Sequence, residues 1–414
     1  MRNSVLRAIP LAAAVLMLAG CGNTDSEADG ISKLTTSGTT AATTTSMTST
    51  AATTTTAAST TTAKATTKAT AKKTTKKTTK KTTATTEETT TTAEVTTTTA
   101  MTTPEHPTPD PESYLPAYGE WIGNVVVCDR YDGERIRGLA PFYGYYSTGQ
   151  WYAEVLNRYK ENFSDINFYN LSCPLSSAFY CPDSMAGTFT EQHGAIQNIG
   201  DYLSGVTNVD CYDVLASHAD EYIYARTDHH WNPLGAYYAA GEFANAAGVE
   251  YASLDSYNEV FKTDYLGSMY GYSGDLQEFA DNPDTFTYYK PRNSYYTRYY
   301  DGYFQNGYDG DLFYDAASGA ACYCSFLGND TQIAEIGTDV GNGRVLVVIK
   351  DSFGNALVPF LVQSFEKIYV VDYRYTYIKM SDFFRQVGAT DVLFGSSLTT
   401  AYADSRIEMI EDMM

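Results

Sequence analysis

The chain has 414 residues, of which 28 are basic and 49 acidic, and its net charge is −21. Before residue 113 lie 11 of the basic and 9 of the acidic side chains, so residues 113–414 carry 17 against 40, a net charge of −23. Because phosphates would be repelled over most of such a surface, this charge argues against nucleic acid as a partner.

The N-terminus has the features of an export signal. Arg2 and Arg7 accompany a mostly apolar run from Ala8 to Ala19, which is too short to be a stable membrane-spanning anchor. The Leu-Ala-Gly-Cys stretch that ends at Cys21 resembles a bacterial lipobox. That resemblance implies that Cys21 becomes lipidated and holds the mature protein on the outer face of the cell membrane, in the bacterial cell envelope. The alternative is an ordinary signal peptide with a chance cysteine.

Residues 22–112 are dominated by Thr, Ala, Ser and Lys. A segment with so few apolar residues cannot offset the entropy lost on ordering, so we predict a disordered linker that as a coil would span roughly 50 Å. The lysines between Lys64 and Lys81 suit contact with anionic wall polymers or lipid head groups, or simply a solubilising spacer. Residues 113–414 form the predicted globular domain.

The first half of that domain alternates between strand-like and helix-like segments. Apolar and β-branched runs predict strands, and a 3.6-residue apolar period predicts helices. In chain order we expect a strand at 121–128, a helix at 145–162, a strand at 166–171, a helix at 191–203 and a strand at 207–211. A further helix is expected to have Asn232 as its cap and Pro233 as its first residue, and to stop at Gly248.

The C-terminal part repeats this alternation more clearly. We expect strands at 344–350, 367–373 and 391–394, with helices ending near 364, at 377–387 and at the C-terminus. Strands that alternate with helices of this length predict an α/β fold whose parallel sheet is covered on both faces.

Residues 286–314 break the alternation, because they hold nine tyrosines and three phenylalanines among many Asp, Gly and Asn. We predict a Tyr-rich insertion, about residues 275–325, that is either a packed loop or a β-excursion over the sheet. Exposed aromatic rings of this kind can stack on sugars.

Six cysteines follow Cys21, and outside the cell an even number permits disulfides. Their spacing fits no zinc motif, so we interpret them as structural thiols or bridges.

The stretch Thr227-Asp228-His229-His230-Trp231 is the first candidate for chemistry. If it continues an extended strand, residues two apart share a face, and the Asp228 carboxylate can reach Nδ1–H of His230. That is the role of the acid in a Ser-His-Asp triad. His229 would then point to the other face, for packing or substrate contact, and Trp231 would wall the site against water.

Ser352 is the candidate nucleophile, because it directly follows the strongest strand and begins a helix. Such a turn exposes Oγ at the carboxyl end of the sheet, and the backbone N–H of Ser352 suits an oxyanion. Gly354 would allow close approach of substrate, and the Asn355 side chain is a candidate second donor. Ser352 could instead be an ordinary helix cap. Together with Asp228 and His230, the nucleophile is the favoured interpretation.

A metal site is the competing interpretation of the paired histidines. DHH phosphoesterases bind manganese through an Asp-His-His motif and an upstream Asp-x-Asp signal, which this sequence lacks. Adjacent histidines on a strand also point apart, which is awkward for one ion. We therefore expect neither a metal nor another cofactor.

Residues 226–239, 265–270 and 348–361 resemble corresponding blocks of the DHHW protein family of exported bacterial proteins. That family is similar to the SGNH-like extracytoplasmic alginate O-acetyltransferases. The resemblance implies an SGNH-like, flavodoxin-type fold with Asp228 as acid, His230 as base and Ser352 as nucleophile. It also implies acetylation of a cell-wall or extracellular polysaccharide, with acetyl supplied by a membrane-bound O-acyltransferase partner.

Two other functions remain open from the sequence. The same three residues would serve a carbohydrate esterase, in which water rather than a sugar hydroxyl accepts the acyl group. A wall-associated lipoprotein that binds polysaccharide without catalysis would equally explain the linker, the acidic surface and the tyrosines.

Overall fold

The computed structural model describes residues 109–414, so the predicted signal segment, the Cys21 lipidation site and nearly all of the linker lie outside the described residues. Within the described part, no helix is both long and apolar enough to cross a membrane. An eight-stranded sheet forms the centre of this part, with the strand order β5-β4-β13-β11-β12-β10-β8-β9.

Five strands of the central sheet are parallel: β5 (Val206–Asn208), β4 (Asn167–Cys173), β13 (Asp391–Ser397), β11 (Val345–Lys350) and β12 (Lys367–Asp372). All five were expected from the sequence as strands, although β5 ends earlier and β13 runs further. β11 lies between β12 and β13, which explains why its apolar run has almost no exposed residue.

The remaining three strands make the sheet mixed instead of wholly parallel. β10 (Ile333–Thr338), β8 (Tyr295–Tyr300) and β9 (Tyr308–Gly310) are added to the β12 side, each antiparallel to its neighbour. The Tyr-rich segment thus supplies the last two strands on this side of the sheet, of which β9 is the edge strand. Both outermost strands, β5 and β9, are only three residues long.

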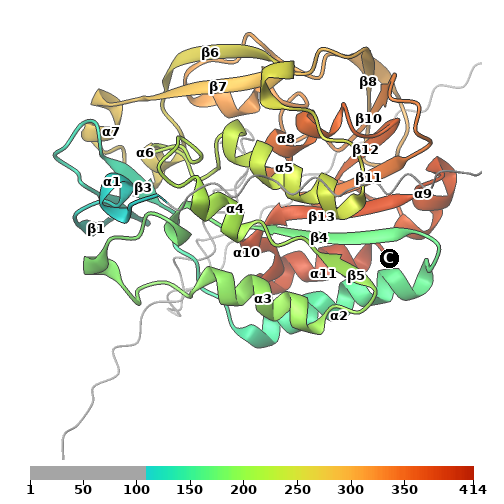
Figure 1. Ribbon diagram of the computed structural model, residues 1–414, viewed down its shortest axis with the longest axis horizontal. Helices are drawn as coiled ribbons and strands as arrows, with labels where there is room; N and C mark the ends of the chain where they lie inside the picture. The colour runs from blue at the N-terminus through green and yellow to red at the C-terminus, as the bar shows by residue number, and fades with distance from the viewer. Residues whose placement is uncertain (1–108) are drawn as a thin grey trace, which may run out of the picture. The chain divides into compact units, whose positions relative to one another are not determined.

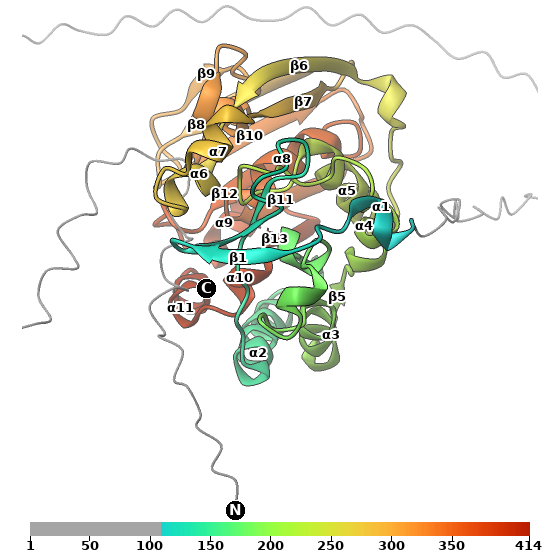
Figure 2. The same ribbon diagram turned by 90° about the vertical axis from the view of Figure 1, so that its left-hand side faces the viewer.

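Helices cover both faces of the parallel part (Figure 1, Figure 2). One face carries α2 (Tyr146–Asn162), α3 (Gln192–Tyr202), α10 (Leu398–Ala401) and α11 (Asp404–Asp412), and the other carries α5 (Pro233–Ala247) and α8 (Phe353–Leu357). In α2 the buried residues recur with helical spacing, as in Gly149, Tyr152, Ala153 and Leu156. The predicted α/β class is therefore confirmed.

Most predicted helix ends agree with the structure. α5 has Pro233 as its first residue and ends at Gly248, which adopts a left-handed φ of 65°. The Asn232 side chain, however, donates to the Tyr222 carbonyl and does not cap the helix. α8 is shorter than expected because it passes into a 3₁₀ turn, Val358–Leu361, that contains Pro359.

Two small sheets flank the central one. The expected strand at 121–128 is in fact a hairpin, β1 (Gly119–Ile122) and β2 (Val125–Cys128), which turns at Gly123 with φ 59° and is extended by β3 (Arg137–Leu139). β6 (Asn258–Tyr265) pairs with β7 (Asp284–Lys290). The remaining helices are short: α1 (Pro111–Tyr114), α4 (Tyr212–Ser217), α6 (Ser268–Tyr272), α7 (Gln277–Asp281) and α9 (Met380–Val387).

The six cysteines of the described part are free thiols. Four of them are buried, and burial raises the pKa of the Cys128 thiol to about 12. Of the two interpretations open from the sequence, the structure has structural thiols and not bridges.

Candidate active site

The segment that contains the two histidines is a bent loop and not the extended strand that we expected. An isolated β-bridge between Tyr224 and Trp231 closes the loop, and Asp284 of β7 holds its base by accepting from both the N–H and the Oγ of Thr227, each at 2.7 Å. As a result the His229 and His230 rings do not point apart. Their centroids lie 3.7 Å from each other.

Asp228 and His230 nevertheless make the predicted contact. Asp228 Oδ1 lies 2.6 Å from Nδ1 of His230 and also accepts from the His230 backbone N–H at 2.9 Å. This second bond is the local turn that an Asp side chain makes with the residue two positions on. The bent loop, and not strand alternation, therefore brings the carboxylate to the imidazole.

The second oxygen of Asp228 is held by α6. Asp228 Oδ2 accepts from the backbone N–H of Ser268 at 2.8 Å. A Cβ at the preceding Gly267 would lie only 2.4 Å from the Asp228 Cβ, so this close approach requires glycine. Both residues belong to the 265–270 block that resembles the DHHW family, which is the signal by which this support could have been found.

These contacts keep Asp228 ionised. Burial alone would raise its pKa, but the imidazoles of His230 and His229 and the hydrogen bonds from His230 and Ser268 together hold it well below its ordinary value. A buried carboxylate in this state accepts Nδ1–H and leaves Nε2 of His230 as the atom that can take a proton.

Ser352 lies on the other side of His230, 122 residues away in the chain. Its Oγ is 2.8 Å from Nε2 of His230. It does not cap α8, because the Asp351 carboxylate accepts from the N–H of Phe353 at 2.9 Å instead. The structure thus brings Asp228, His230 and Ser352 into one line of contacts.

The backbone N–H of Ser352 has no hydrogen-bond acceptor among residues 109–414. It lies at the start of α8, directly beside the Oγ that faces His230. This N–H is therefore available to an oxyanion formed on a substrate.

The two residues predicted to assist Ser352 are placed otherwise. Gly354 faces the sheet, since an added Cβ would lie 2.5 Å from the Lys350 Cβ, and its lack of a side chain serves packing and not substrate approach. Asn355 is 1% exposed, and its Nδ2 donates to Asp330 at 3.0 Å. Its amide nitrogen is thus directed to the Asp330 carboxylate, and a role as oxyanion donor would require its second N–H.

Asp351 fixes the turn that carries the nucleophile, although no local pattern in the chain singles it out. One carboxylate oxygen caps α8, while the other accepts from Ser397 N–H, Ser397 Oγ and Thr400 Oγ1 at 2.7–3.0 Å. The start of α8 is thereby tied to the end of β13.

Tyr323 covers the face of His230 and was likewise not foreseen. The two rings are stacked with centroids 3.8 Å apart and an interplanar angle of 9°, and the Tyr323 hydroxyl donates to the Ser352 carbonyl at 3.1 Å. A tyrosine face stabilises a positive charge on the imidazole. Trp231 is fully buried and donates to the Phe353 carbonyl at 3.1 Å, so it packs behind α8 and supports the site.

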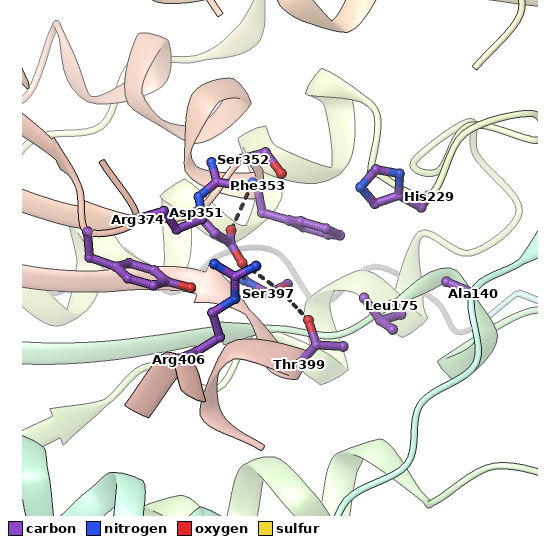
Figure 3. A pocket seen from close by; sticks show the side chains of 11 residues that line it. Ala140, Leu175, His229, Asp351, Ser352, Phe353, Arg374, Ser397, Thr399 and Arg406 are labelled. Carbon is purple, nitrogen blue, oxygen red and sulfur yellow. Dashed lines mark hydrogen bonds between the residues drawn. The ribbon is translucent and has the colours of Figure 1, made fainter. Parts of the chain in front are cut away.

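A cavity of about 30 Å³ adjoins Ser352 (Figure 3). Figure 3 shows Asp351, Ser397 and Arg406 grouped on one side of it and His229 on the other. His229 binds the Ser268 hydroxyl through Nδ1 at 2.6 Å. Burial and then the neighbouring His230 lower the pKa of His229 to about 3, so that this side chain is neutral at the cavity wall.

The same loop has the spacing of a metal site. Each of three residues offers one ligand atom, and these atoms all lie within 4.8 Å of one another; the residues are Asp228, His229 and His230. In this arrangement both nitrogens of His230 face a protein partner, as does Nδ1 of His229. An ion bound through His230 would have to replace the contact with Asp228 or with Ser352.

Comparisons with known proteins identify related chains. The family described as DHHW protein matches residues 189–371. A crystal structure of a DHHW family protein from Eubacterium siraeum has 36% sequence identity and a TM-score of 0.68, over 72% of this chain and 98% of that one. Bacillus cereus PatB1 with a sulfonyl adduct has 18% identity and a TM-score of 0.58, over 69% and 99% of the two chains. At that identity the likeness shows a shared fold. No protein with a curated description matches the chain.

Proposed function

We propose that this chain, which belongs to the DHHW protein family, is a serine-dependent acyltransferase that O-acetylates a cell-wall or extracellular polysaccharide. One observation carries the proposal, namely the continuous line of contacts from Asp228 through His230 to Ser352, with separations of 2.6 Å and 2.8 Å. A serine hydroxyl becomes a nucleophile when a base takes its proton and a carboxylate orients that base. The fold shared with PatB1 is consistent with the SGNH-like, flavodoxin-type fold that the family resemblance implies.

In the first half-reaction Ser352 Oγ attacks the carbonyl carbon of an acetyl donor, and its proton moves to Nε2 of His230. Asp228 stabilises the imidazolium that forms, and the Ser352 N–H donates to the oxyanion. When the intermediate collapses, the bond to the donor's leaving group breaks and His230 returns the proton to that group. Ser352 is left as an acetyl ester.

In the second half-reaction a sugar hydroxyl enters in place of the leaving group. His230 takes its proton as the oxygen attacks the acetyl carbon, and the proton returns to Ser352 Oγ when the sugar ester is released. His230 therefore acts as base and acid in turn, and Ser352 is regenerated.

The cavity beside Ser352 favours a small acyl group. Its volume of about 30 Å³ has room for roughly two water-sized groups, which suits an acetyl methyl and oxygen better than a long chain. A PatB1 structure carries a sulfonyl adduct, and sulfonyl reagents react with activated nucleophiles, which supports looking for the same reactivity at Ser352.

The proposed setting is the outer face of the cell membrane, where Cys21 is lipidated and residues 22–112 act as a disordered linker to a domain at 113–414 with a Tyr-rich insertion at about 275–325. A membrane-bound O-acyltransferase is the proposed source of acetyl. The net charge of −23 on residues 113–414 and the family resemblance support a polysaccharide and not a nucleic acid as the acceptor.

Labelling of the full chain with a fluorophosphonate probe tests the nucleophile. We expect one adduct at Ser352, loss of that adduct in Ser352→Ala, and much slower labelling in His230→Ala. Ser253→Ala, at an exposed serine, is the matched control and should label like the natural chain. Labelling that persists in Ser352→Ala would refute the proposal, and no labelling at all would favour the non-catalytic polysaccharide-binding alternative.

An experiment in cells distinguishes acyl transfer to the polysaccharide from hydrolysis of its acetyl groups. If the chain is a transferase, polysaccharide from a strain that carries Ser352→Ala should contain less O-acetyl than polysaccharide from the parent strain. If the chain is an esterase, the same variant should raise the O-acetyl content. An unchanged content would rule out both.

A further inference from the structure

The His229 ring lies at the wall of the cavity beside Ser352 with one nitrogen bound to the protein and the other unbound. Nδ1 lies 2.6 Å from the Ser268 hydroxyl, and the same hydroxyl accepts from the His229 backbone N–H at 3.2 Å. Nε2 has no hydrogen-bond partner among residues 109–414, and unlike the Asn355 carbonyl oxygen it is not sealed off by its surroundings. The ring is thus fixed through Nδ1 and leaves Nε2 for a ligand.

The orientation of the two imidazoles determines where this nitrogen points. Nδ1 of His230 lies 2.6 Å from Asp228 Oδ1, and Nδ1 of His229 lies 3.8 Å from the same oxygen. The two rings lie side by side, with centroids 3.7 Å apart and an interplanar angle of 37°. Because Nε2 lies almost opposite Nδ1 in an imidazole ring, both Nε2 atoms face away from Asp228. Figure 3 shows a ring nitrogen of His229 directed towards the cavity and Ser352.

The Nε2 atom of His229 therefore lies beside the place where the second substrate enters. Nε2 of His230 lies 2.8 Å from Ser352 Oγ, and in the second half-reaction the incoming hydroxyl lies between this nitrogen and the acetyl carbon. The two rings are 3.7 Å apart, so Nε2 of His229 is close enough to bind a second oxygen of the same acceptor.

The chemistry of His229 favours a hydroxyl as its partner. Burial and the adjacent His230 lower the pKa of His229 to about 3, so the ring is neutral and carries a proton on only one nitrogen. A hydroxyl both donates and accepts, so it can pair with Nε2 in either tautomer, whereas a carboxylate only accepts. Figure 3 shows Leu175 and Ala140 on the same side of the cavity, and their apolar side chains cannot orient a polar ligand.

We propose that His229 is a specificity-determining residue, whose Nε2 binds the hydroxyl next to the one that is acetylated. The inference rests on the proposed transferase function and narrows its acceptor to a sugar with free hydroxyls on adjacent carbons. One hydroxyl gives its proton to His230 while its oxygen bonds to the acetyl carbon, and Ser352 Oγ leaves with that proton. The other hydroxyl stays bound to His229, which neither gains nor loses a proton.

Acetyl transfer from p-nitrophenyl acetate to small alcohols tests this inference with the full chain. The acceptors are trans-1,2-cyclohexanediol and cyclohexanol, and chromatography measures the ester that each one forms. The additional hydrogen bond should make the diol about tenfold better in kcat/KM per hydroxyl group. Equal efficiency of the two alcohols, or no transfer to the diol, would overturn the inference.

His229→Phe keeps an aromatic ring but removes both nitrogens. It should reduce the preference for the diol to less than about twofold, whereas His229→Gln, whose amide can still bind a hydroxyl, should retain part of the preference. His193→Phe, at a histidine of α3 that does not line the cavity, is the matched control and should keep the full preference. A full preference in His229→Phe would refute the assignment, because a merely structural role of the ring would slow transfer to both alcohols alike.

The acetylation of Ser352 itself separates this inference from the proposed function, and mass spectrometry after exposure to p-nitrophenyl acetate detects it. Acetylated Ser352 without a preference for the diol would overturn the role of His229 and leave the nucleophile in place. Absence of acetyl from Ser352 would remove the proposed function, and the role of His229 would fall with it.

Discussion

His229 makes the stability of this protein depend on pH in a predictable direction. Burial and the adjacent His230 lower its pKa to about 3 in the folded state, whereas an unfolded histidine titrates near 6.5. Between these values the unfolded chain binds a proton that the folded chain does not. The contribution of His229 is therefore close to zero above pH 7 and becomes increasingly unfavourable to folding as the pH falls from 6.5 towards 3.

The magnitude follows from the two pKa values. Each pH unit in this window removes about 1.4 kcal/mol, so that lowering the pH from 7.5 to 5.0 should reduce the free energy of unfolding by about 2 kcal/mol through His229 alone. His229→Gln removes this titration. The variant should therefore lose about 2 kcal/mol less than the natural chain between the two pH values.

Urea unfolding followed by tryptophan fluorescence at pH 7.5 and 5.0 measures this difference, provided that the m-value stays constant. Ser268→Ala is the matched control, because it removes the hydroxyl bound to His229 Nδ1 but keeps the imidazole. It should lose as much stability on acidification as the natural chain. If His229→Gln and the natural chain lose the same free energy, the imidazole is not held neutral by its surroundings and the reasoning fails.

Three further substitutions have outcomes that follow from the contacts described above. Asp228→Asn should slow fluorophosphonate labelling of Ser352 by a factor on the order of 10³–10⁴ with the fold retained by circular dichroism, because an amide favours the wrong tautomer of the base; labelling within tenfold of the natural rate would contradict this. Gly354→Ala should lower the free energy of unfolding by about 1–3 kcal/mol in urea, since its Cβ would lie 2.5 Å from the Lys350 Cβ; slower labelling at unchanged stability would instead restore a substrate-facing role. Lys350→Ala leaves the fully buried Asp372 without its partner at 2.8 Å and should lower the free energy of unfolding by about 3 kcal/mol in the same assay. This value is at the low end for a buried ion pair, because Arg374 still pairs with Asp372. A loss below about 1 kcal/mol would show that Arg374 alone is enough to hold Asp372.

The sequence was sufficient to predict the elements that have a strong period. The buried run before Ser352 and the Pro233-to-Gly248 helix were predicted to within a residue or two, because burial on both faces and helix end signals are local properties. The prediction of a single strand at 121–128 was wrong, because these residues belong to a hairpin. The Gly123-Asn124 pair inside it favours a hairpin turn, and Gly123 adopts the positive φ that such a turn requires.

The pairing of Asp228 with His230 was predicted for an incorrect reason. Strand alternation would have placed His229 on the opposite face, whereas the loop stacks its ring against His230. Sequence spacing alone cannot distinguish the two geometries, because both bring residue i to residue i+2. The choice between them depends on Asp284, which lies 57 residues from Thr227 and ties the loop to β7.

Asn355 and Tyr323 show the limit of motif reasoning. Asn355 has the residue type of an oxyanion donor and lies near Ser352 in the chain, but Asp330 binds its amide. Tyr323 comes from a 3₁₀ turn with no regular period, so its stacking on His230 could only be found in three dimensions. The contacts of both side chains depend on residues far away in the sequence, which a local sequence pattern does not indicate.

The two edges of the central sheet bear on how the protein behaves at high concentration. Eight strands with long, open edges would offer unpaired N–H and C=O groups to a neighbouring molecule and invite aggregation. Here β5 and β9 close the sheet with three residues each, and Arg298 and Asp309 form an exposed ion pair across the β8–β9 edge. Such short edges, one of which carries this ion pair, resist strand-to-strand association between molecules.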